Sequence, residues 1–191
     1  MNKRHFYFIL SFLFFFKASA QKEKDSLLFN IHFKWKSELL ELNKNYVSNK
    51  DTLQLSLLKF YISGIEINYA DDTVCNEKNS CHLVNIEDVN SMSFGISKNE
   101  NKTISEVIFN IGVDSIASVS GALSGDLDAT KGMYWAWQSG FINIKIEGKS
   151  NSCKTRKNTF QFHIGGYLEP NYAMRKININ CNNKNQIDLV M

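Results

Sequence analysis

Three histidines, His32, His82 and His163, are the side chains beyond residue 20 best suited to bind a transition metal. Neutral imidazole is the commonest side-chain ligand for copper and zinc. His163 alternates with apolar residues just before two glycines, His82 follows a cysteine, and His32 lies on the polar side of an alternating stretch. Spacing alone leaves open whether any two of them meet. A surface or hydrogen-bonded role is the alternative for each.

Two tryptophans offer a different kind of chemistry. Trp135 and Trp137 point to the same side of the chain if residues 133–137 are extended. Paired indoles are more often part of a core or a lid than of a cofactor site. Whether they lie near the histidines in the fold therefore decides between a packing role and a part in a cofactor site.

Three aspartates are weaker candidates for a metal-binding or catalytic site. Asp126 and Asp128 match part of a calcium-binding loop, but no glutamate follows at the spacing of its bidentate ligand. Together with Asp114, they more often brace turns by accepting hydrogen bonds from nearby amides. The chain also has no GxSxG elbow, HExxH, P-loop or GxGxxG motif. We therefore expect that the protein is not an enzyme, and a hydrolase using Asp126 and Asp128 is the least supported alternative.

Residues 1–20 have the form of a secretory signal peptide. Lys3 and Arg4 precede a nearly continuous apolar run, and small residues at 18–20 provide a cleavage site before Gln21. The run is shorter than the ~20 residues that a membrane-spanning helix needs. A retained anchor helix is the alternative. We predict an exported protein, periplasmic or extracellular, whose mature chain 21–191 has no transmembrane segment.

The charge balance argues against a nucleic-acid partner. Residues 1–20 contain three basic side chains and no acidic one, so the remaining chain has 19 of each. Nucleic-acid binding requires a basic surface that displaces counterions. We therefore expect no nucleic-acid partner.

Four cysteines follow the predicted cleavage site: Cys75, Cys81, Cys153 and Cys181. An even number in an exported chain favours disulfides over metal thiolates. Three pairings are open. We expect Cys75–Cys81, which would close a polar loop, and Cys153–Cys181, which would join two late strands.

Apolar and polar residues alternate with a period of two along most of the mature chain. This pattern is typical of strands with one buried face, and it is clearest at 29–35, 53–57, 141–146 and 160–164. Helical spacing occurs at 115–123, where a short surface helix could form. Many short strands separated by polar turns predict an all-β protein with a single β-sandwich domain.

Residues 112–140 break this alternation. The segment contains five glycines, three aspartates and two tryptophans. A connection of this length in a compact domain is usually functional or disordered, and its aromatic residues argue against disorder. We predict a long ordered loop that closes over one end of the sandwich.

Five short segments, taken in series, carry a family resemblance. They are residues 58–65 (LKFYISGI), 82–85 (HLVN), 112–122 (beginning GVDS), 132–141 (containing MYWAW) and 162–166 (FHIGG). Together they resemble the MbnP-like copper-binding domain of exported bacterial proteins, from about residue 29 to residue 166. Any one segment alone would be weak support.

The resemblance implies an all-β domain that binds copper outside the cytoplasm. In relatives the site uses histidines and a tryptophan oxidised to kynurenine, and a di-haem enzyme related to cytochrome c peroxidases is implicated in that oxidation. By position, His163 matches the histidine of the family's HxGG piece, and His82 matches one that precedes an LV(N/D) strand. His32 is the reserve ligand. Trp135 and Trp137 share the assignment of the oxidised tryptophan.

Two functional hypotheses from different classes follow. The leading one is an exported, non-catalytic protein that holds or delivers copper through His163 and His82. The alternative is a structural or adhesive β-sandwich without metal, whose 112–140 segment contacts a protein or glycan at the cell surface. Exposed aromatic side chains are common anchors at such surfaces. The first requires imidazoles from separate strands to converge on one point beside an indole, whereas the second requires exposed tryptophans and separated histidines.

Overall fold

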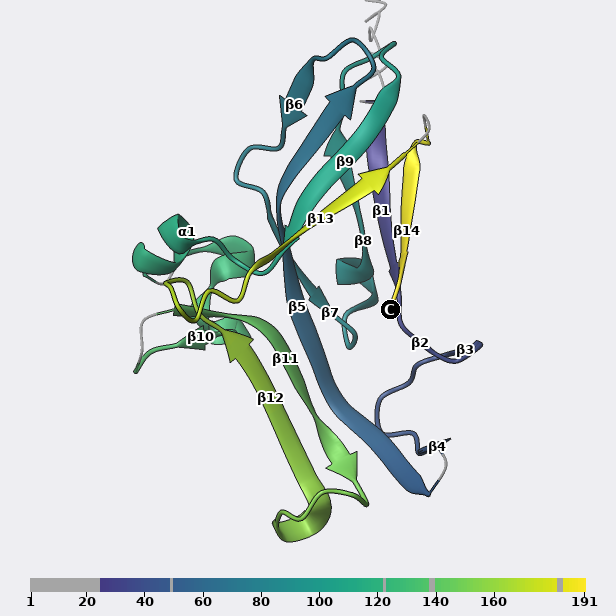
Figure 1. The fold of residues 1–191 in the computed structure, drawn as a ribbon, viewed down its shortest axis with the longest axis vertical. Coiled ribbons are helices and arrows are strands. Elements are labelled where there is room, and N and C mark those ends of the chain that lie inside the picture. The colour runs from purple at the N-terminus through teal and green to yellow at the C-terminus, as the bar shows by residue number, and fades with distance from the viewer. Residues whose placement is uncertain (1–24, 49, 122, 138–139, 182–183) are drawn as a thin grey trace, which may run out of the picture.

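The computed structural model describes residues 25–48, 50–121, 123–137, 140–181 and 184–191. The predicted signal peptide, residues 1–20, lies outside these ranges. Strands dominate the described part and form two packed sheets, which confirms the predicted all-β sandwich (Figure 1). None of the helices in the described ranges is long and apolar enough to cross a membrane.

One long strand, β5 (Asp51–Tyr69), organises the larger sheet (Figure 1). Along one edge it pairs with β11 (Gly140–Ser150) and then with β9 (Ile104–Ile111). Along the other edge it pairs with β4 (Tyr46–Ser48), β7 (Cys81–Asn85) and β6 (Val74–Asn76). Three more strands complete the sheet: β12 (Thr159–Gly165) and β10 (Tyr134–Trp135) beside β11, and β13 (Arg175–Asn180) beside β9.

A smaller sheet of three strands covers part of the larger one. β1 (Ser26–His32) lies between β14 (Gln186–Val190), which is parallel to it, and β8 (Ser93–Ser97), which is antiparallel. A hairpin of β2 (Lys34–Trp35) and β3 (Glu38–Leu39) follows β1. The apolar side of β1 packs against β5 and β9 and forms the main core. Its buried members include Leu27, Phe29, Ile31, Ile62, Ile65, Ile67, Val107 and Phe109.

A bulge at Gly64 changes the direction in which β5 presents its side chains. Ile62 and Ile65 both face the main core, although a regular strand would turn them to opposite faces. The register with β9 shifts between Ser63 and Glu66. Gly64 has φ +58°, in the left-handed region that favours glycine, so it can absorb the extra residue.

The described part of the 112–140 segment packs on the opposite face of β5. It contains α1 (Ser115–Val119), the 3₁₀ turns η2 (Gly125–Leu127) and η3 (Ala129–Lys131), and β10. Tyr61 and Met133 are fully buried there, and the Tyr61 hydroxyl donates to the backbone oxygen of Asp126 over 3.0 Å. The predicted short helix is therefore present as α1, and the described part of the segment covers a face of the larger sheet rather than an end of the sandwich.

The predicted disulfides are wrong, because all four cysteines are free. Cys75 and Cys81 pair with β5 residues four positions apart, a separation of about 13 Å at the rise of a strand. A disulfide requires Cα atoms closer than about 7 Å. Cys153 follows β11 and Cys181 follows β13, which lie toward opposite ends of β5 (Figure 1).

β12 exposes the apolar face that its alternation predicted to be buried. The side chains of Phe162 and Ile164 are 57% and 45% exposed. The small sheet packs mainly against the β5–β9 half of the larger sheet, so β12 lies beyond its reach. The periodicity was therefore informative about the strand but not about what covers it.

Candidate metal site

His163 is held in place by a carboxylate on the neighbouring strand. Its Nε2 lies 2.7 Å from Oε1 of Glu147, and these side chains are only 28% and 24% exposed. Lys145 is directly opposite His163 in the ladder, and its Nζ is 3.8 Å from the same carboxylate oxygen. A carboxylate bonded to one ring nitrogen orients the imidazole and leaves the other nitrogen for a metal, an arrangement common in metal sites.

Trp135 lies beside this pair. A Cβ placed on Gly165 would be 2.7 Å from Cζ3 of the indole, so the ring packs directly on the Gly165 backbone. Gly165 is two residues beyond His163 and therefore shares its face of β12. Trp137 contacts Trp135 at a ring-centroid distance of 5.7 Å but is 77% exposed. The structure thus places Trp135 on the same face of β12 as His163, over Gly165, and turns Trp137 outward.

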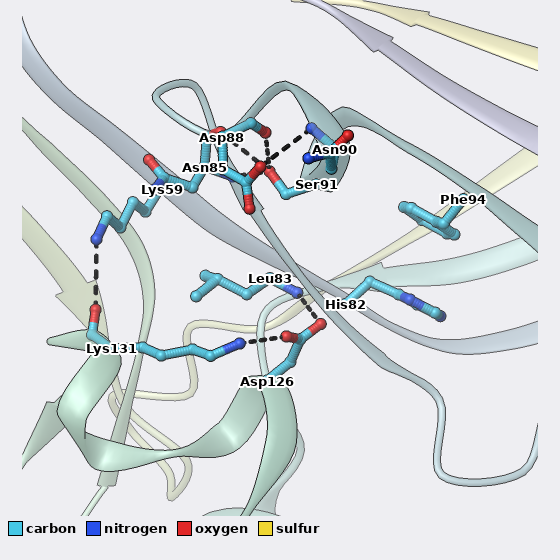
Figure 2. Close-up of a pocket in the computed structure, with 10 residues that line it drawn as sticks. All are labelled: Lys59, His82, Leu83, Asn85, Asp88, Asn90, Ser91, Phe94, Asp126 and Lys131. Atoms are coloured by element: carbon cyan, nitrogen blue, oxygen red, sulfur yellow. Dashed lines mark hydrogen bonds and ion pairs between the residues drawn. The ribbon is translucent and has the colours of Figure 1, made fainter.

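His82 belongs to a second imidazole–carboxylate pair. Its Nε2 is 2.9 and 3.0 Å from the two carboxylate oxygens of Glu77. The ring also stacks on Phe94, with centroids 4.0 Å apart and planes 5° from parallel. Figure 2 shows the two rings lying side by side. One face of the His82 ring is therefore covered by Phe94, and its Nε2 is bonded to Glu77.

A cavity of about 410 Å³ opens next to His82, between β7, η1 (Val89–Met92) and the turns of the 112–140 segment. Asp126 accepts a hydrogen bond from the Leu83 amide over 3.0 Å and pairs with Lys131 over 2.6 Å (Figure 2). The Lys59 ammonium donates to the Lys131 backbone oxygen. The polar groups of this cavity are thus largely bonded to one another, and its lining includes one imidazole, that of His82.

The aspartates of the 112–140 segment brace turns. Asp114 caps α1 by accepting the Ala117 amide over 2.7 Å, and Asp128 caps η3 by accepting the Thr130 amide over 2.8 Å. Within the described ranges, no group of three or more His, Cys, Asp and Glu side chains is placed to hold a metal ion. A complete ligand set is therefore not gathered by the described side chains of one chain.

The three histidines lie in separate places, so the expected convergence of His163 and His82 on one ion is not found within a single chain. The ladder leads from His163 across β11 and β5 to Asn85 on β7, three strand steps or about 14 Å away. His82 is three residues further along β7. His32 lies in the other sheet, with its Nε2 3.5 Å from Asp188.

The carboxylate partners are the site residues that sequence analysis missed. Glu147 and Glu77 stand 16 and 5 residues from their histidines. The polar side of the 141–146 alternation continues to Glu147, so pairing this stretch with 160–164 as a hairpin would have found it. No comparable signal marks Glu77, because it lies in the loop before β7.

Comparison with known proteins agrees with the small all-β fold described above. The chain belongs to the MbnP family, whose family model matches residues 24–191. Among solved structures, MbnP from Methylosinus trichosporium is similar, with a TM-score of 0.56 and 12% identity over 85% of this chain and 75% of that one. At this identity the likeness concerns the fold. No curated protein sequence matches the chain.

Proposed function

We propose that this protein binds copper outside the cytoplasm and holds or delivers the ion without catalysing a reaction. Membership of the MbnP family supports a role connected with copper. The observation that carries the proposal is the half-buried His163–Glu147 pair beside the indole of Trp135. Imidazole nitrogen and carboxylate oxygen are donors that suit Cu(II).

The residues of this face fit such an ion. Glu147 orients the ring of His163 through Nε2 and leaves the other ring nitrogen for an ion. The Lys145 ammonium lies 3.8 Å from the same Glu147 oxygen and adds a positive charge beside the carboxylate. The His82–Glu77 pair offers a second, separate imidazole of the same kind. Copper is the cargo in this proposal, and the chain provides the ligands that retain it.

Titration of the purified protein with Cu(II), and with Cu(I) in competition with a chelator, tests the proposal. We expect His163→Ala to abolish the tighter site and Glu147→Gln to weaken it by about 10–100-fold, the usual effect of removing an orienting partner. His32→Ala is the matched control, because His32 is also paired with a carboxylate but is half exposed in the other sheet. Unchanged affinity in both His163→Ala and His82→Ala would overturn the assignment of copper to these histidines.

Oxidation of a tryptophan is a separate part of the proposal. Trp135 is the favoured residue, because it packs on Gly165, two residues beyond His163, while Trp137 is turned to solvent. Conversion to kynurenine would be the work of an external oxidising enzyme, for which a di-haem protein related to cytochrome c peroxidases is our candidate. Peptide mass spectrometry of protein from its native host tests this. An unmodified Trp135 in copper-loaded material would rule out oxidation without affecting the copper assignment.

A structural or adhesive role is the second candidate function. It is favoured by the exposure of Trp137 and of the α1 side chains Ile116 and Val119, which are 78% and 65% exposed. Such a role predicts that Trp137→Ala weakens attachment of the protein to cell surfaces while copper affinity stays negligible. A His163-dependent copper affinity together with unchanged attachment in Trp137→Ala would reject it.

A further inference from the structure

β12 is an outer strand of the larger sheet. One of its edges is bonded to β11, and Figure 1 shows the other facing away from the domain. Among the described strands, β11 is the partner to which β12 is bonded. Proteins commonly protect such edges with lysine, proline, a bulge or a very short strand. β12 has seven residues, TFQFHIG, and contains neither lysine nor proline.

The apolar face of β12 continues an apolar groove toward this edge. Phe162 and Ile164 lie opposite Ile146 and Ile144 of β11 in the ladder. Those two β11 residues line a groove of about 410 Å³ whose other walls include Phe33, Leu58 and Phe60, with Lys34 as its one charged lining residue. The exposed side chains of Phe162 and Ile164 thus extend an apolar surface toward the edge of β12 that faces away from β11.

The sequence of β12 is complementary to itself in an antiparallel pairing centred on Phe162. In that register Phe162 faces Phe162 of a second copy, and Phe160 faces Ile164. All these apolar pairs fall on one face of the joined sheet, while Gln161 faces His163 on the other. A shift of one residue would place apolar side chains opposite polar ones. A shift of two would keep the pattern but form two apolar pairs instead of three, so the register centred on Phe162 is favoured.

Charge at the two ends of β12 supports the same arrangement. Arg156 and Lys157 are exposed in the turn before the strand, and Glu169 is exposed shortly after it. Antiparallel pairing sets the basic end of each copy beside the acidic end of the other. Opposite charges would therefore meet at both ends of the interface.

The pairing also brings two copies of the candidate metal site together. His163 of one copy and His163 of the other become diagonal neighbours on the polar face, about 7–8 Å apart at the backbone. Two imidazoles from such positions can reach one ion at about 2.0–2.1 Å each. Glu147 of each copy lies beside its own histidine. Two chains thus supply the nitrogen and oxygen donors that one chain provides only in part.

We propose that two copies of this chain pair through their β12 edges and share one copper ion between the two His163 side chains. The metal part rests on the proposed function, whereas the pairing rests on the edge, the apolar face and the register. Copper binds the pair more tightly than the single chain, so the ion shifts the equilibrium toward the dimer.

The test combines molar mass with copper stoichiometry. Light scattering after size exclusion, with and without Cu(II), is expected to give a dimer that binds one ion per two chains. Phe162→Lys sets two ammonium groups opposite each other and is expected to return the mass of one chain. Val47→Lys is the control, because Val47 is an apolar strand residue of similar exposure, 62%, on β4; it should remain dimeric. Circular dichroism confirms that both variants are folded.

Each of the other possible results of this test overturns one part of the proposal. A monomer that binds one ion per chain through His163 would reject the shared site and leave the proposed function intact. A dimer that persists in Phe162→Lys would show that another surface makes the contact. A β12-dependent dimer that binds no copper would reject both the shared ion and the proposed copper function.

As an independent measurement, Phe162→Cys should cross-link two copies on mild oxidation, because facing residues of antiparallel strands lie about 4.5–5.5 Å apart. Peptide mapping distinguishes this bond from any formed by the native cysteines. The control Val47→Cys should not cross-link through residue 47. Failure of Phe162→Cys to cross-link under conditions where the protein is dimeric would reject the proposed register.

Discussion

An alanine at Gly165 tests the contact that places Trp135 beside His163. The added Cβ would lie 2.7 Å from the backbone oxygen of Phe141 and 2.7 Å from Cζ3 of Trp135. Non-bonded carbon atoms normally sit about 3.5–4.0 Å apart. Because the Phe141 oxygen belongs to a strand backbone, it cannot move far without disturbing the sheet. The indole therefore has to shift.

The expected change in the free energy of unfolding of Gly165→Ala is the sum of two opposing effects. Forcing an extra methyl group into a packed site costs about 1–3 kcal/mol. Replacing glycine by alanine also restricts the unfolded chain, which stabilises the folded state by about 0.4–1 kcal/mol. We therefore expect Gly165→Ala to lower the free energy of unfolding by about 1.3 kcal/mol, and by no more than about 2.6 kcal/mol.

Gly95→Ala on β8 is the matched control. A Cβ at Gly95 would meet Ser26 at 3.6 Å, an ordinary contact distance. The variant should therefore be as stable as the wild type or slightly more stable. Urea unfolding followed by circular dichroism measures both stabilities, and tryptophan emission reports movement of the indole. If Gly165→Ala matched Gly95→Ala in stability and left the emission unchanged, Trp135 would not pack on Gly165 and the candidate site would lose its indole.

Three further predictions concern the rest of the fold. Met133→Ala should lower the free energy of unfolding in urea by about 2–5 kcal/mol, because Met133 is fully buried; a loss below about 1 kcal/mol would show that the 112–140 segment is not docked. Tyr61→Phe removes the hydroxyl that donates to Asp126, and the same assay should show a loss of about 1 kcal/mol. Burial first, and then the nearby Asp126 carboxylate, raise the pKa of the Cys81 thiol from 9.0 to about 12. The folded state therefore holds this proton more tightly, so wild-type stability should fall more steeply than that of Cys81→Ala between pH 9 and 12, and equal slopes would contradict this.

The fold could be predicted because its strands are mostly half buried. In β1 the alternation of Phe29 and Ile31 with polar residues directly reflects one face packed on β5. The same rule described β12 correctly as a strand but could not say what covers it, because the extent of the smaller sheet is a tertiary property. The bulge at Gly64 likewise depends on pairing with β9, which no local pattern reports.

The disulfide prediction failed for a related reason. An even number of cysteines in an exported chain is a statistical argument, whereas bonding depends on where each residue lies in a ladder. Cys75 and Cys81 are close in sequence, yet both lie on strands that pair with the same edge of β5, several residues apart. Glu147 was missed in the same way, since it meets His163 only through the pairing of β11 with β12.

A single chain leaves two features of β12 incomplete: one face is apolar but uncovered, and the other carries only part of a metal-ligand set. Its apolar face is uncovered at Phe162 and Ile164, and its polar face carries His163 with one carboxylate rather than a full ligand set. Full burial of such apolar side chains is worth about 1.5–3 kcal/mol each, so covering the exposed half of four of them contributes about 3–6 kcal/mol to a dimer. Association costs about 4–15 kcal/mol in lost freedom of motion. Apolar burial and edge hydrogen bonds alone would thus give a weak dimer, and an ion shared by both His163 side chains would be needed to make the pairing tight.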